Sequence, residues 1–518
     1  MNEQIGAALN LLPEYLARHV LLCASALTLG VMLGLPLAIV GSRYPRIRSP
    51  LLATASLIQT IPGLALLALF YPLLLALSTI TDSLFGFGIP ALGFLPSLLA
   101  LTLYSILPIL RNGVTGLVGL HPAVIEAADA VGMTSRQRLI RVEAPLAAPV
   151  VMAGIRTAAV WTIGAATLST SVGQTSLGNY IFSGLQTENW VFVLFGCAAA
   201  AALAFVVDQA LNLIETGVAR GDAKRISIGL ASVAVGTAAA LAFILHDVTK
   251  AYSVGAKNFS EQFILAELIS ARIADQGATT QRKDGLGSAI AFRALASSDI
   301  DVYVDYSGTL WTNVMQRRDA PLRDAMLREL TQWLEQHYGV RVLGSLGFEN
   351  AYALAMRADR AAKLGVKSID DLARLAPQLA LGADLEFLSR PEWAALKQAY
   401  SLNFSVERSF SPTFMYRALE EGSVDVISAF SSDGRIAAQG YVVLTDPKHA
   451  IPAYDAVVLI APRKARDALL ERALAPLIGR ISVENMRQAN LMVDRETNKA
   501  TPKDASRFLA RAIGLDAP

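Results

Sequence analysis

The chain has 518 residues, enough for more than one domain. Its 45 Lys and Arg nearly balance its 43 Asp and Glu, and a net charge of +2 is too small to indicate a nucleic-acid partner. The only cysteines, Cys23 and Cys197, both lie inside apolar runs, so the sequence offers neither a disulfide framework nor a cysteine zinc site. We expect no metal centre and interpret both thiols as small core residues.

Long apolar runs dominate the chain up to about residue 245. Those of spanning length lie at about 20–41, 51–78, 89–110, 147–169, 191–213 and 226–245. The first run lacks a convincing cleavable signal peptide, so we expect it to be retained as a span. Residues 1–246 are therefore predicted to form an all-α polytopic membrane domain with about six spans.

Basic residues are distributed unevenly among the loops between these runs. The loops of about 79–88 and 170–190 contain no Lys or Arg. The loops after the first, third and fifth runs contain Arg43, Arg46, Arg48, Arg111, Arg136, Arg138, Arg141, Arg220, Lys224 and Arg225. By the positive-inside rule these three loops are cytoplasmic, which places the N-terminus and everything after Leu245 outside.

Two stretches at membrane depth are polar and interrupt the helical pattern. They are 59–63 (QTIPG) and 169–174 (STSVGQ). Small polar residues and broken helices at that depth usually face protein or a water-filled path. The sequence leaves open whether these stretches line a translocation pathway or serve in helix packing.

The loop 122–145 contains a polar, basic stretch between two apolar runs. It includes Glu126, Ala127, Ala128, Gly132 and Pro145. This spacing resembles the EAA loop of ABC importer permeases, with Val142 in place of the usual Ile and Ala144 in place of the usual Leu. The resemblance implies a type I permease whose loop forms a coupling helix on a separate ATP-hydrolysing subunit. We expect Gly132 to allow a sharp turn and Pro145 to begin a new helix; the alternative is an ordinary amphipathic loop helix.

The second half, 250–518, alternates β-branched or apolar stretches with amphipathic helices, which predicts an α/β fold. The predicted elements begin with strands near 252–255, 300–304 and 340–343 and helices over 261–274 and 321–336. No GxxxxGK[ST] phosphate loop occurs in the sequence, so the chain is not itself a P-loop ATPase. ATP is expected to bind to a partner subunit, and we expect no cofactor in this chain.

Several short motifs follow one another in this half. They are 255–262 (GAKNFSEQ), 301–309 (DVYVDYSGT), 348–354 (FENAYAL), 429–436 (AFSSDGRI) and 451–456 (IPAYDA). They resemble those of extracytoplasmic substrate-binding proteins for glycine betaine, choline and related quaternary amines, a family in which fusion to a permease is known. The resemblance implies a type II, two-lobed periplasmic-binding-protein-like domain. Lobe one would combine 252–349 with 456–518, and lobe two would be 352–454.

The resemblance also assigns a ligand site. The family's aromatic cage falls on Tyr306, Tyr352, Phe430 and Tyr454, although family members usually have Tyr where Phe430 stands. Aromatic faces suit a quaternary ammonium because it has no proton to donate and is held by cation–π attraction. The same resemblance implies Lys257, Thr309 and Arg390 as partners of a ligand carboxylate, with Asn258 beside them in the first motif.

Together these patterns predict the membrane-spanning and substrate-binding subunit of an ATP-driven importer of quaternary-ammonium osmoprotectants. We expect a multi-pass protein of the bacterial cytoplasmic (inner) membrane, with two copies of this chain and two ABC ATPase subunits. Choline, carnitine, proline betaine and ergothioneine remain open as substrates beside glycine betaine. A membrane-tethered receptor without transport is a distant alternative. An enzyme is disfavoured because the sequence offers no nucleophile with a paired base.

Overall fold

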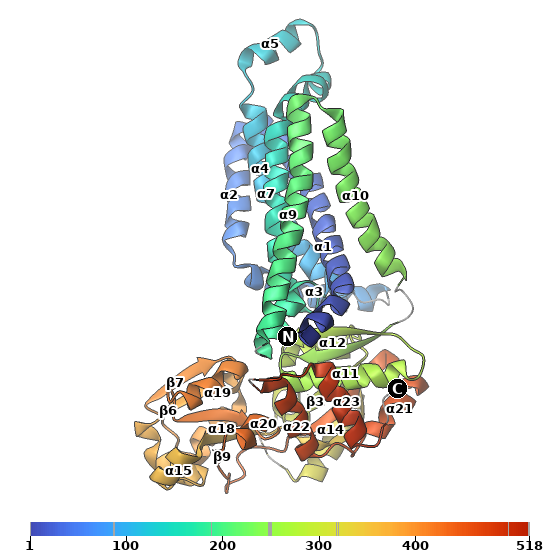
Figure 1. The fold of residues 1–518 in the computed structure, drawn as a ribbon. Helices are drawn as coiled ribbons and strands as arrows, with labels where there is room; N and C mark the ends of the chain where they lie inside the picture. The colour runs from blue at the N-terminus through green and yellow to red at the C-terminus, as the bar shows by residue number, and fades with distance from the viewer. Residues whose placement is uncertain are drawn as a thin grey trace. The chain divides into compact units, whose positions relative to one another are not determined.

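A computed structural model describes residues 2–85, 89–187, 189–246, 251–317, 319, 321–495 and 497–515. The chain divides into two compact units. The helical unit comprises Met1–Phe182 with Val191–Val248, and the α/β unit comprises Ser183–Trp190 with Thr249–Pro518. Figure 1 labels the elements of both.

The helical unit contains long apolar helices joined by short segments. Its elements are α1 (Asn2–Arg43), α2 (Pro45–Thr60), α3 (Gly63–Phe85), α4 (Phe94–Val118), α5 (Pro122–Ala130), α6 (Ser135–Arg138), η1 (Leu139–Glu143), α7 (Ala144–Ala166), η2 (Thr167–Val172), α8 (Gly178–Gln186), α9 (Trp190–Arg220) and α10 (Ala223–His246). Within the described residues, five helices are long and apolar enough to cross a membrane, or up to six when the bent pair α2 and α3 counts as one span. The predicted number of about six spans agrees with this range.

The bent pair accounts for the predicted break within the second run. Residues Pro45–Thr60 and Gly63–Ser78 meet at 98°. Ile61, which precedes Pro62, has an extended backbone with φ −68° and ψ 126°. A proline disfavours the helical conformation of the residue before it and cannot donate a backbone hydrogen bond, so the helix ends there.

Close helix packing in this unit depends on small residues. Helix α4 packs against both α1 and α7 (Figure 1). A Cβ added at Gly154 of α7 would lie 2.6 Å from the Asn112 Cβ and 2.8 Å from the Pro108 carbonyl oxygen of α4. Small residues at such crossings let two backbones approach closely, which is how helices associate in a lipid environment.

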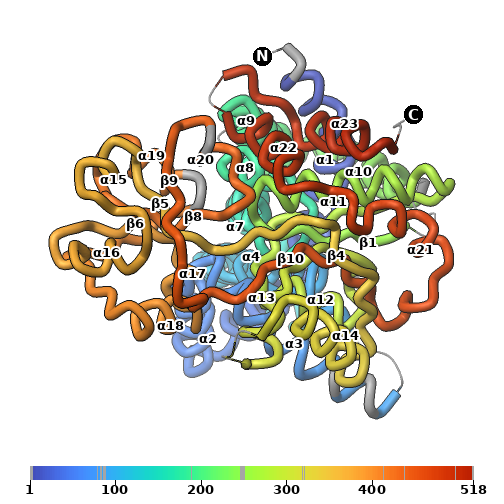
Figure 2. Tube along the Cα trace, turned by 90° about the horizontal axis from the view of Figure 1, so that it is seen from below, coloured from blue at the N-terminus to red at the C-terminus, as the bar shows by residue number. Residues whose placement is uncertain are grey.

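The α/β unit contains two five-stranded sheets. The strands are β1 (Tyr252–Lys257), β2 (Thr280–Leu286), β3 (Val302–Tyr306), β4 (Arg341–Glu349), β5 (Tyr352–Arg357), β6 (Ala380–Asp384), β7 (Val406–Phe410), β8 (Val426–Phe430), β9 (Tyr441–Val443) and β10 (Asp455–Ile460). The first sheet has the order β2-β1-β3-β10-β4 and the second the order β7-β6-β8-β5-β9. The chain passes from the first sheet to the second after β4 and returns before β10, as the tube in Figure 2 shows.

Helices flank both sheets. They are α11 (Ser260–Ala274), α12 (Ser288–Ala296), α13 (Ser307–Thr309), η3 (Leu310–Val314), α14 (Arg323–Tyr338), α15 (Ala358–Leu364), α16 (Ile369–Leu375), η4 (Ala376–Gln378), α17 (Leu385–Ser389), α18 (Pro391–Tyr400), α19 (Pro412–Glu420), α20 (Gly434–Ala438), η5 (Pro462–Lys464), α21 (Ala468–Leu474), η6 (Ala475–Leu477), α22 (Val483–Asp494) and α23 (Pro502–Ala512). The last three α-helices pack against α11, and all four help to bury the apolar core that includes β1, β3 and β10. The α/β architecture predicted from the alternating pattern is confirmed, with strand and helix ends shifted by a few residues.

Candidate ligand-binding site and coupling loop

Four aromatic residues predicted for the ligand site lie at strand ends where the chain passes between the two sheets. Tyr306 ends β3, Tyr352 begins β5, Phe430 ends β8, and Tyr454 directly precedes β10. The register pairs Tyr352 with Phe430 across the antiparallel strands β5 and β8. Strand ends of an α/β sheet are where ligands usually bind.

The ring of Tyr352 contacts two of the other rings directly. The ring centroids of Tyr352 and Phe430 are 5.0 Å apart, and those of Tyr352 and Tyr454 are 5.7 Å apart with perpendicular planes. Tyr306 joins this group through Phe259, whose ring lies 6.2 Å from Tyr306 and 6.3 Å from Phe430, parallel to the latter. Phe259 is part of the motif 255–262, but it was not among the residues predicted for the aromatic cage.

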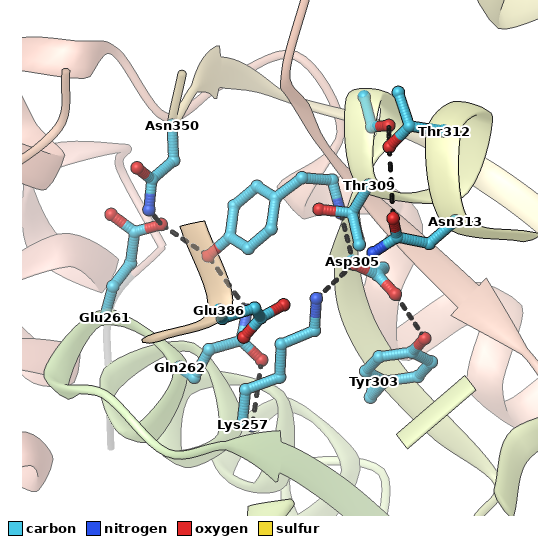
Figure 3. Close-up of polar contacts among 12 residues, drawn as sticks. Lys257, Glu261, Gln262, Tyr303, Asp305, Thr309, Thr312, Asn313, Asn350 and Glu386 are labelled. Carbon is cyan, nitrogen blue, oxygen red and sulfur yellow. Dashed lines mark hydrogen bonds and ion pairs between the residues drawn. The ribbon is translucent and has the colours of Figure 1, made fainter. Parts of the chain in front are cut away.

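Polar side chains fix the position of Tyr306, and Figure 3 labels three of them, Glu261, Gln262 and Asn350. The Tyr306 hydroxyl donates to Glu261 Oε1 at 2.6 Å and accepts from Gln262 Nε2 at 2.9 Å. Asn350 Nδ2 donates to the same Glu261 oxygen at 3.0 Å, and Asn490 Nδ2 donates to the other at 2.9 Å. Burial raises the pKa of the Glu261 carboxyl, while these neutral donors act in the opposite direction.

The two predicted cationic ligand partners already have carboxylate partners. Lys257 Nζ forms a buried ion pair with Asp305 (Figure 3). The same nitrogen lies 5.2 Å from the centroid of the Tyr306 ring. Arg390 pairs with Glu386, and its Cζ lies 5.1 Å from the centroid of Tyr352. Asn258 is exposed at the end of the strand that contains Lys257.

Arg390 also reaches residues that follow β3 of the first sheet. Its Nη1 lies 3.4 Å from Thr309 Oγ1, and the neighbouring Glu392 accepts hydrogen bonds at Oε1 from Tyr454 Oη and, at 2.9 Å, from Thr312 Oγ1. Glu392 is buried at the start of α18. Glu392 was not predicted as a site residue, because an acidic residue in the first turn of a helix is common for reasons of helix stability alone.

The loop that resembles the EAA motif forms a short helix, a turn and a second helix. Glu126, Ala127 and Ala128 lie on α5, with Glu126 exposed and Ala128 buried. Gly132 has φ +77° in the turn that follows, as expected for a position that needs a left-handed backbone. Thr134 then caps α6 through a capping box with Gln137.

The prediction that Pro145 begins a new helix needs correction. Pro145 does lie in the first turn of α7, but α7 continues a helix that starts at Ser135 and passes through the π-helical turn η1. A proline has no backbone N–H and its ring crowds the preceding turn. The wider π-helical turn before Pro145 accommodates that ring without ending the helix.

A chain of ion pairs connects the loop to the end of α1. Arg138 binds Asp129 of α5 and donates from Nε to Glu143 Oε1 at 2.8 Å, while Arg43 pairs with the other oxygen of Glu143. The Glu143 side chain is 3% exposed. The contacts therefore link three separate segments: the loop helix, the π-helical turn and the last turn of α1.

These features define a class of protein. One part is a bundle of apolar helices with a loop that resembles the EAA motif. The other is a two-sheet α/β unit whose aromatic rings lie where the chain passes between the sheets. Together they form the architecture of a permease fused to a substrate-binding domain. Among the described residues, no group of three or more His, Cys, Asp or Glu is placed to hold a metal ion.

Comparison with known protein families agrees with this class. The substrate-binding domain of ABC-type glycine betaine transport systems (OpuAC) matches residues 250–511, and the inner membrane component of binding-protein-dependent transport systems matches residues 28–220. The chain therefore belongs to the glycine betaine-type ABC importer family, as a multi-pass membrane protein that combines the permease and the substrate-binding domain. Its role is that of a transport subunit.

One relative spans most of the chain, and two others match a shorter part of it. The ergothioneine transport permease/ergothioneine binding protein EgtU of Helicobacter pylori is 28% identical over 488 residues, which cover 90% of this chain and 84% of the relative. The choline transport system permease protein OpuBB of Bacillus subtilis is 38% identical over 197 residues, covering 38% of this chain and 83% of the relative. The glycine betaine/carnitine/choline transport system permease protein OpuCB of the same organism is 34% identical over 197 residues, with the same coverage.

Proposed function

We propose that this chain imports small molecules that carry a quaternary ammonium group. The observation that carries the proposal is the group of aromatic rings formed by Phe259, Tyr306, Tyr352, Phe430 and Tyr454. A trimethylammonium group cannot donate a hydrogen bond, and each aromatic face attracts it by about 0.5 to 2 kcal/mol, with the larger value where water is excluded.

The ligand's second group is assigned to the polar end of the site. We propose that Arg390, Thr309 and Lys257 interact with a carboxylate of a betaine, with Asn258 near the entrance. Since Lys257 and Arg390 already pair with acidic residues, a ligand carboxylate would share these cations. Such sharing limits how much the carboxylate adds to affinity, so the ammonium group is the main determinant of recognition.

Among quaternary-ammonium compounds, ergothioneine is a further candidate beside glycine betaine, choline and carnitine. The support is that EgtU of Helicobacter pylori, named for ergothioneine, matches both parts of the chain together. Ergothioneine has a trimethylammonium group, a carboxylate and ring N–H groups, so it could use the same aromatic rings.

The transport cycle follows from the same assignment. Ligand would close lobe one (252–349 and 456–518) onto lobe two (352–454) by a hinge motion. Two ABC ATPase subunits would bind ATP, dock on the loop 122–145 and drive two copies of this chain between outward-facing and inward-facing states. The chain itself would hold no cofactor. The α/β unit would lie outside the bacterial cytoplasmic membrane, so protease added to intact spheroplasts should release it, and protection from protease would contradict this topology.

The first test is titration calorimetry on the full chain in lipid nanodiscs. Glycine betaine, choline, carnitine and ergothioneine are compared, with proline as a control that lacks the quaternary ammonium group. We expect micromolar or tighter binding of at least one quaternary amine and much weaker binding of proline. A folded protein that binds none of the four would contradict the proposed substrate class.

A further inference from the structure

Glu392 has one oxygen without a partner inside the candidate site. Its Oε1 accepts from Tyr454, from Thr312 at 2.9 Å and, at 3.5 Å, from Arg390 Nη1. Its Oε2 is buried and has no hydrogen-bond partner, and the side chain is 1% exposed. The carboxylate is thus held firmly by one oxygen while the other remains available.

A buried carboxylate oxygen without a donor is costly. Leaving a buried polar group unsatisfied destabilises the folded protein, and the effect is larger when the group is charged. The oxygen belongs to a side chain bonded to Tyr454, whose ring contacts Tyr352 in the aromatic group. The Glu392 carboxylate therefore lies beside the aromatic group in which a ligand would be held.

The neighbouring charges determine what kind of ligand group fits there. Arg390 pairs with Glu386 through Nη2 and lies against Glu392 through Nη1, while its buried Nε has no partner. The site thus offers one unused acceptor beside one unused donor. A ligand that carries only a carboxylate would satisfy the donor and leave the acceptor unpaired, whereas a ligand with an additional O–H or N–H would satisfy both.

We propose that Glu392 is a specificity-determining residue whose Oε2 accepts a hydrogen bond from an O–H or N–H group of the quaternary-ammonium ligand. This inference rests on the proposed function and narrows it. The preferred substrates are trimethylammonium compounds with a proton donor, such as an alcohol or a ring N–H. Simple betaines without a donor bind more weakly.

The test uses pairs of ligands that differ by one hydroxyl group. Carnitine is compared with γ-butyrobetaine, choline with ethyltrimethylammonium, and ergothioneine is measured as a ligand with ring N–H groups. The full chain in nanodiscs is titrated as wild type, as Glu392→Gln and as Glu407→Gln. Glu407 lies on β7, outside the site, and pairs with Lys397 of α18, the helix that contains Glu392. The variant Glu407→Gln therefore controls for the loss of one negative charge.

In Glu392→Gln the amide oxygen is expected to face the Tyr454 and Thr312 hydroxyls, which places the NH₂ group where Oε2 was. A donor then faces the ligand's donor. We expect wild type and Glu407→Gln to bind the hydroxylated member of a pair at least tenfold more tightly than its partner. In Glu392→Gln that preference should disappear and ergothioneine affinity should fall at least tenfold.

The ligands without a donor also report on folding, because they should bind Glu392→Gln about as well as wild type. An equal loss of affinity for all ligands would mean that Glu392 only supports the structure of the site. An unchanged preference for hydroxylated ligands would mean that Glu392 Oε2 does not contact the ligand. Either result overturns this inference and leaves the proposed function standing. If the folded wild type binds none of these quaternary amines, the proposed function fails and this inference fails with it.

Discussion

Glu143 Oε1 accepts a hydrogen bond of 2.8 Å from Arg138 Nε. Because Arg138 also binds Asp129 of α5, this contact connects the π-helical turn before α7 to the loop helix α5. Arg43 at the end of α1 pairs with the other oxygen of the same carboxylate. A single buried acidic group thus connects the loop with two membrane helices. If the loop receives force from an ATPase, this carboxylate is where that force reaches α1.

Replacing Glu143 by Gln should impair transport without impairing ligand binding. Removing one member of a buried ion pair leaves its cation uncompensated, which costs about 3–5 kcal/mol when both groups are fully buried and less here, since Arg43 is 34% exposed. We expect uptake into proteoliposomes with the ATPase to fall at least tenfold, with unchanged affinity for ligand. Glu14→Gln removes a partly exposed pair with Arg18 in α1 and should have little effect. Normal uptake by Glu143→Gln would exclude a coupling role for the carboxylate.

The turn at Gly132 should tolerate Asn but not Val. Its φ of +77° is in the left-handed region, and no heavy atom lies within 4 Å of an added Cβ, so only backbone strain distinguishes the variants. This strain costs about 1–2 kcal/mol for an ordinary residue, while Asn adopts this conformation more readily. Uptake assays should therefore show a clear loss for Gly132→Val and near-normal transport for Gly132→Asn. Equal activity of the two variants would show that the turn is not required.

Tyr306 should contribute to ligand binding through its ring and to stability through its hydroxyl. Tyr306→Ala removes the ring and should weaken binding at least tenfold, about 1.4 kcal/mol. Tyr306→Phe keeps the ring but removes the donor to Glu261, which should cost about 1–3 kcal/mol of stability with a smaller effect on affinity. Calorimetry and thermal unfolding of the two variants separate these effects. Unchanged affinity in Tyr306→Ala would remove this residue from the site.

An ion pair between α7 and α9 should stabilise the helical unit. Arg156 Nη2 lies 2.7 Å from Asp208 Oδ2, and its Nη1 reaches Asn212 and Glu215 at 3.1 and 3.4 Å. Arg156→Ala should lower the melting temperature in detergent because three acceptors lose their cation. Exchanging the charges, with Arg156→Asp and Asp208→Arg together, should recover part of the loss. A double variant no more stable than either single exchange would show that the pair itself contributes little.

The free energy of unfolding of the α/β unit should decrease as the pH rises from about 4 to about 6. Burial raises the pKa of Asp494 from 3.8 to about 6, and Arg435 only partly offsets this shift. In that range the folded protein binds more protons than the unfolded chain, so the free energy of unfolding falls as pH rises through it and levels off above pH 6. Asp494→Asn removes this group while keeping an acceptor for Ser260. Its melting temperature should vary less with pH than that of wild type, and an identical pH dependence would contradict the assignment.

Sequence patterns predicted the elements well because their signals are local. Apolar runs identified the spans, and Pro62 explained the break between α2 and α3. The ends of α1 were less predictable, since the helix begins at Asn2 although the apolar run begins near residue 20. A segment that is amphipathic and not uniformly apolar gives no hydropathy signal for a span.

The candidate site was predictable only in part. Tyr306, Tyr352, Phe430 and Tyr454 came from family motifs, and their rings do gather, with Phe259 as an additional member. The roles of Glu392 and Glu143 depend on partners far away in the sequence, such as Tyr454, 62 residues from Glu392, and Arg43, 100 residues from Glu143. No local pattern contains such long-range pairs.

The connection between α10 and β1 has a kinetic consequence. Helix α10 ends at His246 and β1 begins at Tyr252, so residues 247–251 are the whole covalent connection. Even fully extended, a segment of this length spans about 20 Å. Such a short tether gives the α/β unit an effective concentration at its own permease on the order of millimolar. If the α/β unit delivers ligand to its permease, that delivery does not depend on how many separate receptor molecules the cell makes, and a docking affinity that would be negligible between separate proteins is sufficient.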